Sequence, residues 1–235
     1  MTTMTDFMEN FIVNPESTYD QSSMTGSGMY SSVFDSDMPN MVVKHSARTF
    51  RSSNCFTDGW LIWAILCMNR NMKYGSGWSF MPVIHGLIIN YETGEFHAVI
   101  ERLKEVRKPT HHRGRGKPNF TGYMDDVLSS DIDKWNKPFW DGKIPYKKAI
   151  KKAFLEIVSI FRETKATNTP IFIDAHDANW MWRETPSGRH SMVLTDPFTV
   201  SYDFMSADGA LSYNQMLVDV AQGNPNIKII GQPKK

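Results

Sequence analysis

The sequence predicts an α+β protein of two lobes: an antiparallel sheet lobe with one helix, then a reduced and mainly helical lobe. Two pairs of β-rich runs flank one apolar helical stretch within residues 1–103. An amphipathic helix pattern appears only later, at 147–165, beyond a basic stretch of different composition. We therefore expect a flexible arm over 1–23, the sheet lobe over 24–103 and the helical lobe over 104–235, all within one domain.

The composition favours a compact cytoplasmic protein. A chain of 235 residues with 41% hydrophobic residues is long enough for one core or for two small lobes that share a cleft. The net charge of +1 gives no reason to expect nucleic acid or an acidic membrane as a partner. Two cysteines, Cys55 and Cys67, are too few for a disulfide framework and indicate a reducing compartment. No signal peptide or membrane span is expected, since the longest apolar run covers residues 60–68, well short of the roughly 20 residues that a span needs.

Residues 25–44 predict a hairpin that starts at a glycine-rich turn. The runs TGSGMYSSVF and MVVK are β-rich, and the residues between them, DSDMPN, are a turn signal. Residues 57–70, TDGWLIWAILCMNR, predict a largely buried helix, with Thr57 or Asp58 as its cap. The segment 81–103 contains two further β-rich runs around Glu-Thr-Gly, which predict a second hairpin.

The second lobe opens with a basic stretch. Residues 104–122 are rich in Lys, Arg, Pro and Gly, which predicts a solvated, mobile loop. Its part 104–117 is the one segment that could attract an acidic protein or nucleic acid. The pair His111–His112 has no Cys or His partner at zinc spacing, so we expect no metal there. The remaining elements are expected in this order: a helix at 147–165, an apolar strand at 171–174, a hairpin at 180–197 and a weak helix at 211–220.

The first candidate site residues lie in and before the first hairpin. Gly26 and Gly28 let the backbone approach a ligand and present N–H groups to phosphate oxygens, although Gly-x-Gly also fits an ordinary turn. Lys44 ends the run Met-Val-Val-Lys, where a partly buried ammonium group needs an anion as its partner. The alternative is a lysine whose charged end reaches solvent.

Three polar residues in the second half follow an order that suits phosphoryl transfer. Asp174 and Asn179 come after the apolar run IFI, and Asp196 ends the next hairpin. One carboxylate can deprotonate or orient an acceptor hydroxyl, while an amide oxygen and a second carboxylate hold Mg²⁺ on the phosphates. The hairpin brings Asn179 and Asp196 side by side because its two ends are neighbours. The alternative is that these are turn residues whose side chains hydrogen-bond to the nearby backbone. His176 is expected to pack within the loop.

Taken together, these residues resemble a known family. The motifs that follow the order of the protein-kinase signature are Gly26-x-Gly28-x-x-Ser31-x-Val33, Val43-Lys44, Asp174-x-x-x-x-Asn179 and Asp196. The segments GSGMYSSVF, DAHDAN and TDPF resemble those of the early serine/threonine protein kinases of T-seven-type bacteriophages, over about residues 24–205.

The resemblance implies a protein-kinase-like fold with an ATP site between its lobes. It assigns the ATP phosphates to Gly26, Ser27, Gly28 and Lys44, the adenine ring to Val33 and Ile100, and the hinge hydrogen bonds to the Glu101 carbonyl and the Leu103 N–H. It also implies that Asp174 is the catalytic base, with Lys44 and Asn179 beside it, and that Asn179 and Asp196 bind Mg²⁺.

Several positions depart from the family pattern. Ser31 stands where a third glycine is expected, and the segment Asp196-Pro197-Phe198 has lost its flexible glycine. Ile173 replaces the Arg that often precedes the catalytic Asp, which argues against control by a phosphate on an activation loop. The Glu that should pair with Lys44 has no clear equivalent, and Asp58 is our candidate for this role.

The function implied by the resemblance is an ATP- and magnesium-dependent protein kinase that phosphorylates Ser or Thr of host proteins in the host cell cytoplasm. Thr199 and Ser201 lie just beyond Asp196 and are candidate autophosphorylation positions, where a phosphate would repel ATP. Two alternatives remain open. One is a small-molecule phosphotransferase of the same fold, because DAHDAN also resembles the loop of aminoglycoside and choline phosphotransferases. The other is a kinase-like protein without catalysis that binds and masks a host factor.

Overall fold

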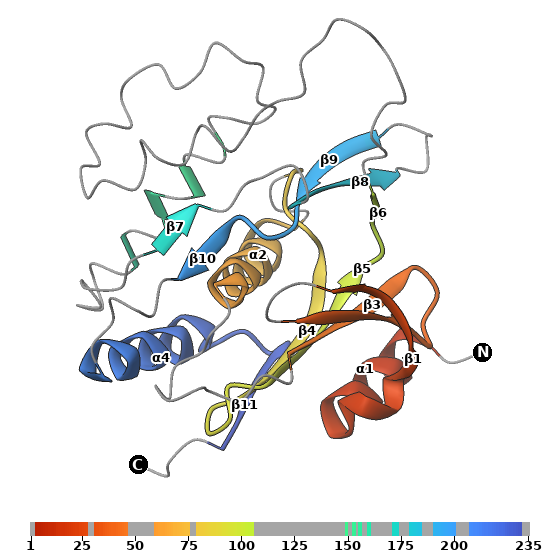
Figure 1. The fold of residues 1–235 in the computed structure, drawn as a ribbon, viewed down its shortest axis with the longest axis horizontal. Coiled ribbons are helices and arrows are strands. Elements are labelled where there is room, and N and C mark those ends of the chain that lie inside the picture. The colour runs from red at the N-terminus through yellow and green to blue at the C-terminus, as the bar shows by residue number, and fades with distance from the viewer. Residues whose placement is uncertain are drawn as a thin grey trace, which may run out of the picture.

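The computed structural model describes residues 3–27, 31–46, 59–75, 79–105, 171–173, 179–184, 190–200 and 207–231, together with scattered helical positions between 149 and 160. A six-stranded sheet forms its centre, with helices on both sides (Figure 1). The protein is therefore α+β with a largely antiparallel sheet, as the sequence predicts.

The strand order of the central sheet is β1-β2-β3-β5-β4-β11. All neighbours from β1 to β4 in this order are antiparallel, whereas β11 runs parallel to β4. The two predicted hairpins therefore lie side by side in one sheet. The strands span Tyr19–Ser27 (β1), Ser32–Ser36 (β2), Met41–Ser46 (β3), Ile84–Asn90 (β4), Phe96–Glu101 (β5) and Ile227–Ile230 (β11).

Helix α2, Trp60–Tyr74, covers one face of this sheet and forms the main core. Every residue from Trp60 to Met68 is buried, which explains why the sequence there is apolar on all sides. The N-cap residue of the helix is Gly59, which has no side chain to form a capping hydrogen bond. The predicted N-cap at Thr57 or Asp58 is therefore wrong. Cys67 lies inside this core, where burial raises the pKa of its thiol and keeps it protonated.

Helix α1, Met4–Val13, covers the opposite face. It differs from the predicted flexible arm because Thr3 and Asp6 form a capping box and Phe7 and Phe11, one turn apart, are buried against the sheet. Gly86 on β4 leaves room for this contact, since a Cβ there would lie 3.2 Å from the Phe11 ring. A 3₁₀ helix, Pro15–Thr18, then leads into β1.

Two smaller sheets lie beyond α2. The predicted third hairpin is present as β8, Trp180–Glu184, and β9, His190–Leu194, and β6, Lys104–Glu105, pairs with β8. Strand β7, Ile171–Ile173, pairs with β10, Phe198–Val200. The indoles of Trp60 and Trp63 donate hydrogen bonds of 3.0 and 3.1 Å to the carbonyls of Thr195 and Leu194, which join α2 to the end of β9.

Some of the described elements after residue 103 pack against the first half of the chain. Helix α4, Ala207–Ala221, packs beside α2, and the Asn69 amide donates a 2.9 Å hydrogen bond to the Val220 carbonyl. Strand β11 then completes the central sheet. Described positions between 149 and 160 are helical, in agreement with the helix predicted at 147–165. Within the described residues, no helix has the length and apolar content needed to cross a membrane.

Candidate functional site

Lys44 and Asp196 form the centre of the candidate site. Lys44 Nζ lies 3.3 Å from Asp196 Oδ2, although 152 residues separate them in the chain. The same ammonium group lies 4.2 Å from the centre of the Trp60 ring. Only 10% of the Lys44 side chain is exposed, so the carboxylate and the aromatic face replace most of the water that its charge would otherwise hold.

The alternation of side chains along β3 explains why Lys44 points to this place. Val43 and His45 face α1, so Lys44 between them faces α2 and the end of β9. Its cross-strand neighbour on β2 is Val33, and Ile100 on β5 lies opposite Val42 on the same face. The predicted phosphate and adenine contacts, Lys44, Val33 and Ile100, therefore share one surface of the sheet.

Asn179 stands next to Asp196 at the open end of the β8–β9 hairpin. Its side-chain amide donates a 2.6 Å hydrogen bond to the backbone carbonyl of Asp196. The Thr195 N–H and hydroxyl both donate to the Asn179 carbonyl, at 2.8 and 3.0 Å. The Oδ1 atom of the same amide is an acceptor of the kind that can act as a metal ligand. An amide oxygen and a carboxylate side by side are ligands of the type that Mg²⁺ takes.

The chain passes from the central sheet to β6 beside this site. Ile100 is buried, and the Glu101 N–H donates a 3.0 Å hydrogen bond to the Val83 carbonyl. Leu103 is half-buried in the short connection between β5 and β6. Of the predicted hinge residues, Glu101 thus lies at the end of β5, which pairs with β3, and Leu103 lies in the connection to β6.

Arg183 and Glu101 hold this connection in place, and this pair is not predicted from the sequence. Arg183 Nε donates to Glu101 Oε2 at 2.7 Å, and its Nη2 donates to Oε1 at 2.5 Å and to the Met81 carbonyl at 2.6 Å. Glu101 Oε1 also accepts a 2.8 Å hydrogen bond from the Val83 N–H. No local pattern marks these residues, because 82 positions separate the two partners.

Gly26 and Ser27 end β1 opposite Val33 and Ser32. An added Cβ at Gly26 would meet only Val33 Cβ, at 3.9 Å, which is ordinary contact. Packing within the described part of the chain therefore does not itself require a glycine at this position.

Some predicted site residues lie outside the described residues: Gly28, Asp58, Asp174, His176 and Ser201, as well as most of the basic stretch 104–122. The described neighbours of Asp174 still give its approach. Ile173 is the last residue of β7 and pairs with Phe198, two positions after Asp196. The structure thus brings together Lys44, Asn179 and Asp196, and the strand that leads to Asp174 pairs with the segment following Asp196.

Comparison with known proteins gives no assignment, because the sequence matches no family model and no curated protein sequence.

Proposed function

We propose that this protein is an ATP- and magnesium-dependent protein kinase that transfers the γ-phosphate to Ser or Thr of other proteins, with phage origin and host-protein substrates carried over from the family resemblance. The observation that carries the proposal is the 3.3 Å approach of Lys44 to Asp196, with Asn179 bonded to the same residue. A lysine on the third strand, an Asn and a second Asp are the residues that the kinase signature places around the nucleotide phosphates.

The order of the elements supports the same proposal at the level of the fold. Lys44 lies on the third strand of an antiparallel sheet, a buried helix follows it, and a hairpin carries Asn179 and Asp196 at its two ends. We therefore propose a two-lobed, protein-kinase-like fold in which the Arg183–Glu101 pair joins the lobes. Helix α4 and strand β11 are extra elements in this proposed fold, and they pack on α2 and pair with β4 of the first lobe.

Each side chain has a defined part in the proposed transfer. The Lys44 ammonium binds the α- and β-phosphates, and the N–H groups around Gly26, Ser27 and Gly28 cover them. Val33 and Ile100 contact the adenine ring, while the Glu101 carbonyl and the Leu103 N–H bind its edge. Asn179 and Asp196 hold Mg²⁺, which when bound neutralises charge on the phosphates. Asp174 accepts the proton of the attacking hydroxyl.

The partner of Lys44 is the main difference from the kinase pattern. Helix α2 contains no acidic residue between Trp60 and Tyr74, so the usual Glu of this helix is missing from it. Asp196 and the Trp60 ring are two of the groups that contact the ammonium. We propose that Trp60 positions Lys44 and that Asp196 turns from Lys44 to the metal when the nucleotide binds.

Transfer of labelled γ-phosphate from ATP with Mg²⁺ into a bacterial lysate tests the proposal, with the wild type compared with Asp174→Ala and Lys44→Met. Lys73→Met is the matched control, because Lys73 is exposed in the last turn of α2, at the opposite end of the helix from Trp60. Labelled protein bands that vanish in both site variants and persist in the control support the proposal. Label confined to small molecules would indicate a small-molecule phosphotransferase, and absence of any transfer would indicate a binding protein. Either result contradicts a protein kinase.

A further inference from the structure

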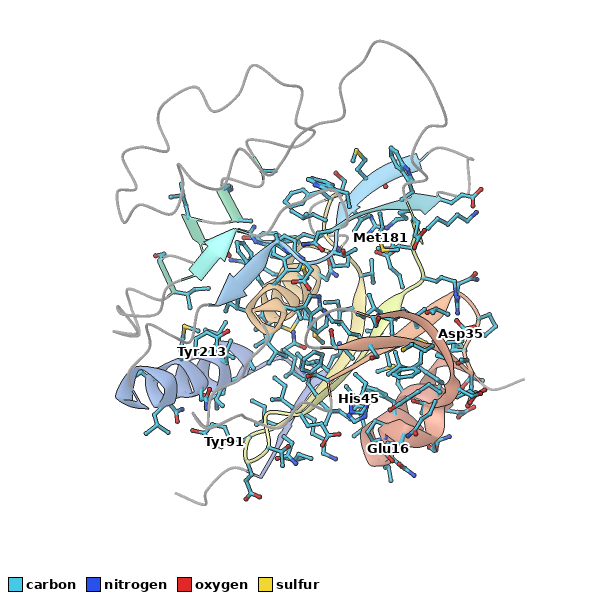
Figure 2. All side chains as sticks on the ribbon, viewed as in Figure 1. Glu16, Asp35, His45, Tyr91, Met181 and Tyr213 are labelled. Carbon is cyan, nitrogen blue, oxygen red and sulfur yellow. The ribbon has the colours of Figure 1, made fainter. Side chains whose placement is uncertain are left out.

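A second polar cluster lies on the face of the sheet opposite Lys44. His45 and His97 are directly opposite each other on the antiparallel strands β3 and β5. Glu95 precedes His97 by two residues, and side chains two apart on extended chain share a face. All three therefore project toward the side that α1 covers, where His45 is labelled in Figure 2.

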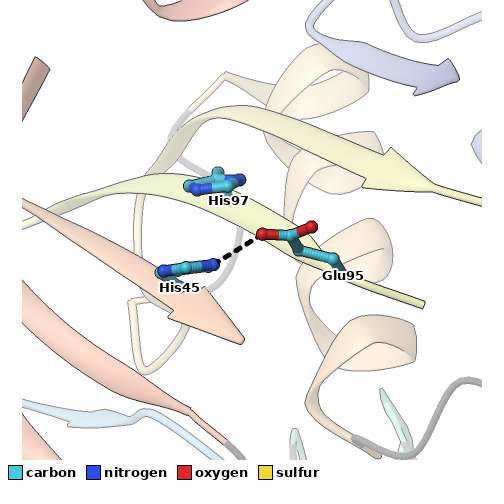
Figure 3. Close-up of side chains that lie close together, drawn as sticks. All are labelled: His45, Glu95 and His97. Atoms are coloured by element: carbon cyan, nitrogen blue, oxygen red, sulfur yellow. Dashed lines mark hydrogen bonds and ion pairs between the residues drawn. The ribbon is translucent and has the colours of Figure 1, made fainter. Parts of the chain in front are cut away.

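The three side chains are close enough to share one ion. His45 Nε2 lies 2.9 Å from Glu95 Oε1, and the two imidazole rings stack with their centres 4.1 Å apart (Figure 3). One nitrogen from each histidine and one carboxylate oxygen all lie within 4.8 Å of one another. His97 is buried, and the His45 and Glu95 side chains are 14% and 32% exposed, so the rigid sheet holds two of the groups and solvent reaches the third.

Tyr19 supplies the outer contact that such a site needs. Its hydroxyl lies 3.2 Å from His45 Nδ1 and 3.4 Å from His97 Nε2. A phenol oxygen has two lone pairs and can accept an N–H from both rings at once. In that arrangement His97 Nδ1 carries a lone pair, and His45 Nε2 gains one when the metal replaces the proton that it donates to Glu95.

A cavity provides access to the cluster. It has a volume of about 220 Å³, and Glu95 and His97 form part of its wall. Glu16 and Asn90 also line it, so the cavity beside the cluster has polar side chains that a water ligand could contact. Lys228, which also lines the cavity, donates a 3.0 Å hydrogen bond to the Ile12 carbonyl.

From this geometry we propose that His45, His97 and Glu95 bind one divalent ion of the Zn²⁺ class, with water from the cavity as the fourth ligand. Two imidazoles and one carboxylate suit Zn²⁺ and its neighbours in the transition series, and not Mg²⁺, so the site is separate from the proposed nucleotide site. Zinc-to-ligand distances of about 2.0–2.2 Å set ligand atoms roughly 3.3–3.6 Å apart in a tetrahedral site. Binding therefore breaks the His45–Glu95 hydrogen bond and turns the stacked rings until their lone pairs converge.

The ion would fasten the N-terminal segment to the sheet. Tyr19 begins β1, and Glu16 belongs to the 3₁₀ helix that connects it to α1. Contact of the ligands with Tyr19 links the metal to the position of this whole segment, which suggests a stabilising role. The inference does not depend on kinase activity, because the cluster and Lys44 lie on opposite faces of the sheet.

Zinc binding to tag-free, chelator-treated protein tests the proposal, measured by competition with a chromophoric chelator and by metal content. We expect one equivalent of Zn²⁺, a higher Tm, and for Co²⁺ the visible absorption of a tetrahedral ion. Glu95→Gln keeps the size of the side chain but removes the anionic ligand, and His97→Gln removes one imidazole. Each single variant should weaken Zn²⁺ binding at least tenfold. His85→Gln, which changes a histidine of β4 outside the cluster, should leave binding unchanged.

Circular dichroism of each variant shows whether it has folded, and Glu95→Gln keeps the test valid if His97→Gln does not fold. Absence of saturable binding in the wild type would mean that the cluster is only a hydrogen-bonded network and would overturn the proposal. Equal affinity in wild type and Glu95→Gln would overturn it as well. So would loss of binding in a His111→Ala, His112→Ala double variant with no effect in the cluster variants.

Discussion

Lys44 Nζ and Asp196 Oδ2 stand 3.3 Å apart at the point where the third strand of the sheet meets the end of the β8–β9 hairpin. The contact joins two halves of the chain, and the Trp60 ring of α2 also packs on the Lys44 ammonium group. A phosphate group that enters between the two residues would replace the carboxylate as the partner of the ammonium. The first predictions follow from that exchange.

Lys44→Met should reduce phosphate transfer by roughly 100-fold or more, because it removes the ammonium group that we propose binds the α- and β-phosphates. The methionine keeps the apolar stem that lies on the Trp60 ring. Initial rates with ATP and Mg²⁺ check this, with Lys73→Met, at the far end of α2, as the control. A loss of transfer equal in both variants would contradict the assigned role of Lys44.

Asp196→Asn should raise the Mg²⁺ concentration needed for half-maximal activity by roughly tenfold, because a neutral amide is a poorer ligand than a carboxylate. The measurement is a Mg²⁺ titration of the transfer rate at fixed ATP. Asp219→Asn removes one carboxylate at an exposed position of α4 and should leave the Mg²⁺ dependence unchanged. If Asp196→Asn retained the wild-type titration, Asp196 would not be a metal ligand.

Arg183→Leu should lower the free energy of unfolding by roughly 2–3 kcal/mol. This is somewhat less than the cost of removing one partner from a fully buried ion pair. The side chains of Arg183 and Glu101 are 23% and 15% exposed, which limits the cost of leaving the carboxylate alone. Urea unfolding gives the free energy. Lys104→Leu breaks the exposed pair with Glu184 and should change stability by less than about 1 kcal/mol.

Phe11→Ala should cost about 3–4 kcal/mol, because the ring is fully buried between α1 and the sheet. Val13→Ala, at an 82% exposed position of the same helix, should be nearly neutral. Equal unfolding free energies for the two variants would mean that α1 does not stay packed on the sheet in solution.

Stability should fall as the pH drops below about 6.5, partly because of His85. Burial lowers the pKa of His85 in the folded state, while Glu101 opposes the shift. The unfolded chain then binds a proton more readily than the folded one, so this contribution is complete above pH 6.5 and is lost as the pH falls toward the folded-state pKa. His85→Gln should make the decline in Tm between pH 7 and pH 5 less steep than in the wild type. An unchanged slope would contradict the prediction.

The elements that the sequence predicts well are those with local signals. The apolar stretch of α2 and the two runs of β4 and β5 around Glu-Thr-Gly need only their own periodicity. The α1 helix also carried local signals, the Thr3–Asp6 box and the Phe7–Phe11 spacing, but its polar surroundings favoured an arm. Strand β11 has only four residues, and its partner β4 is more than a hundred positions earlier, so nothing nearby predicts it.

The candidate site divides in the same way. The sequence predicts that Lys44, Asn179 and Asp196 lie together because the kinase signature has these residue types in this order, and the structure brings the three together. Glu101 was expected only for its carbonyl, whereas its carboxylate holds Arg183. The pairing of His45 with His97 depends on the register of β3 against β5, which no spacing in the sequence reveals.

The parallel pairing of β11 with β4 also has a consequence for synthesis of the protein. Strands β1 to β5 lie within residues 19–101, but the outer edge of β4 has no partner until residues 227–230 have been made. During translation the nascent chain therefore carries an open, apolar strand edge that includes Leu87, Ile88 and Ile89. Completion of the sheet must wait until β11 has left the ribosome, and ribosome-bound chains that end before it should recruit chaperones.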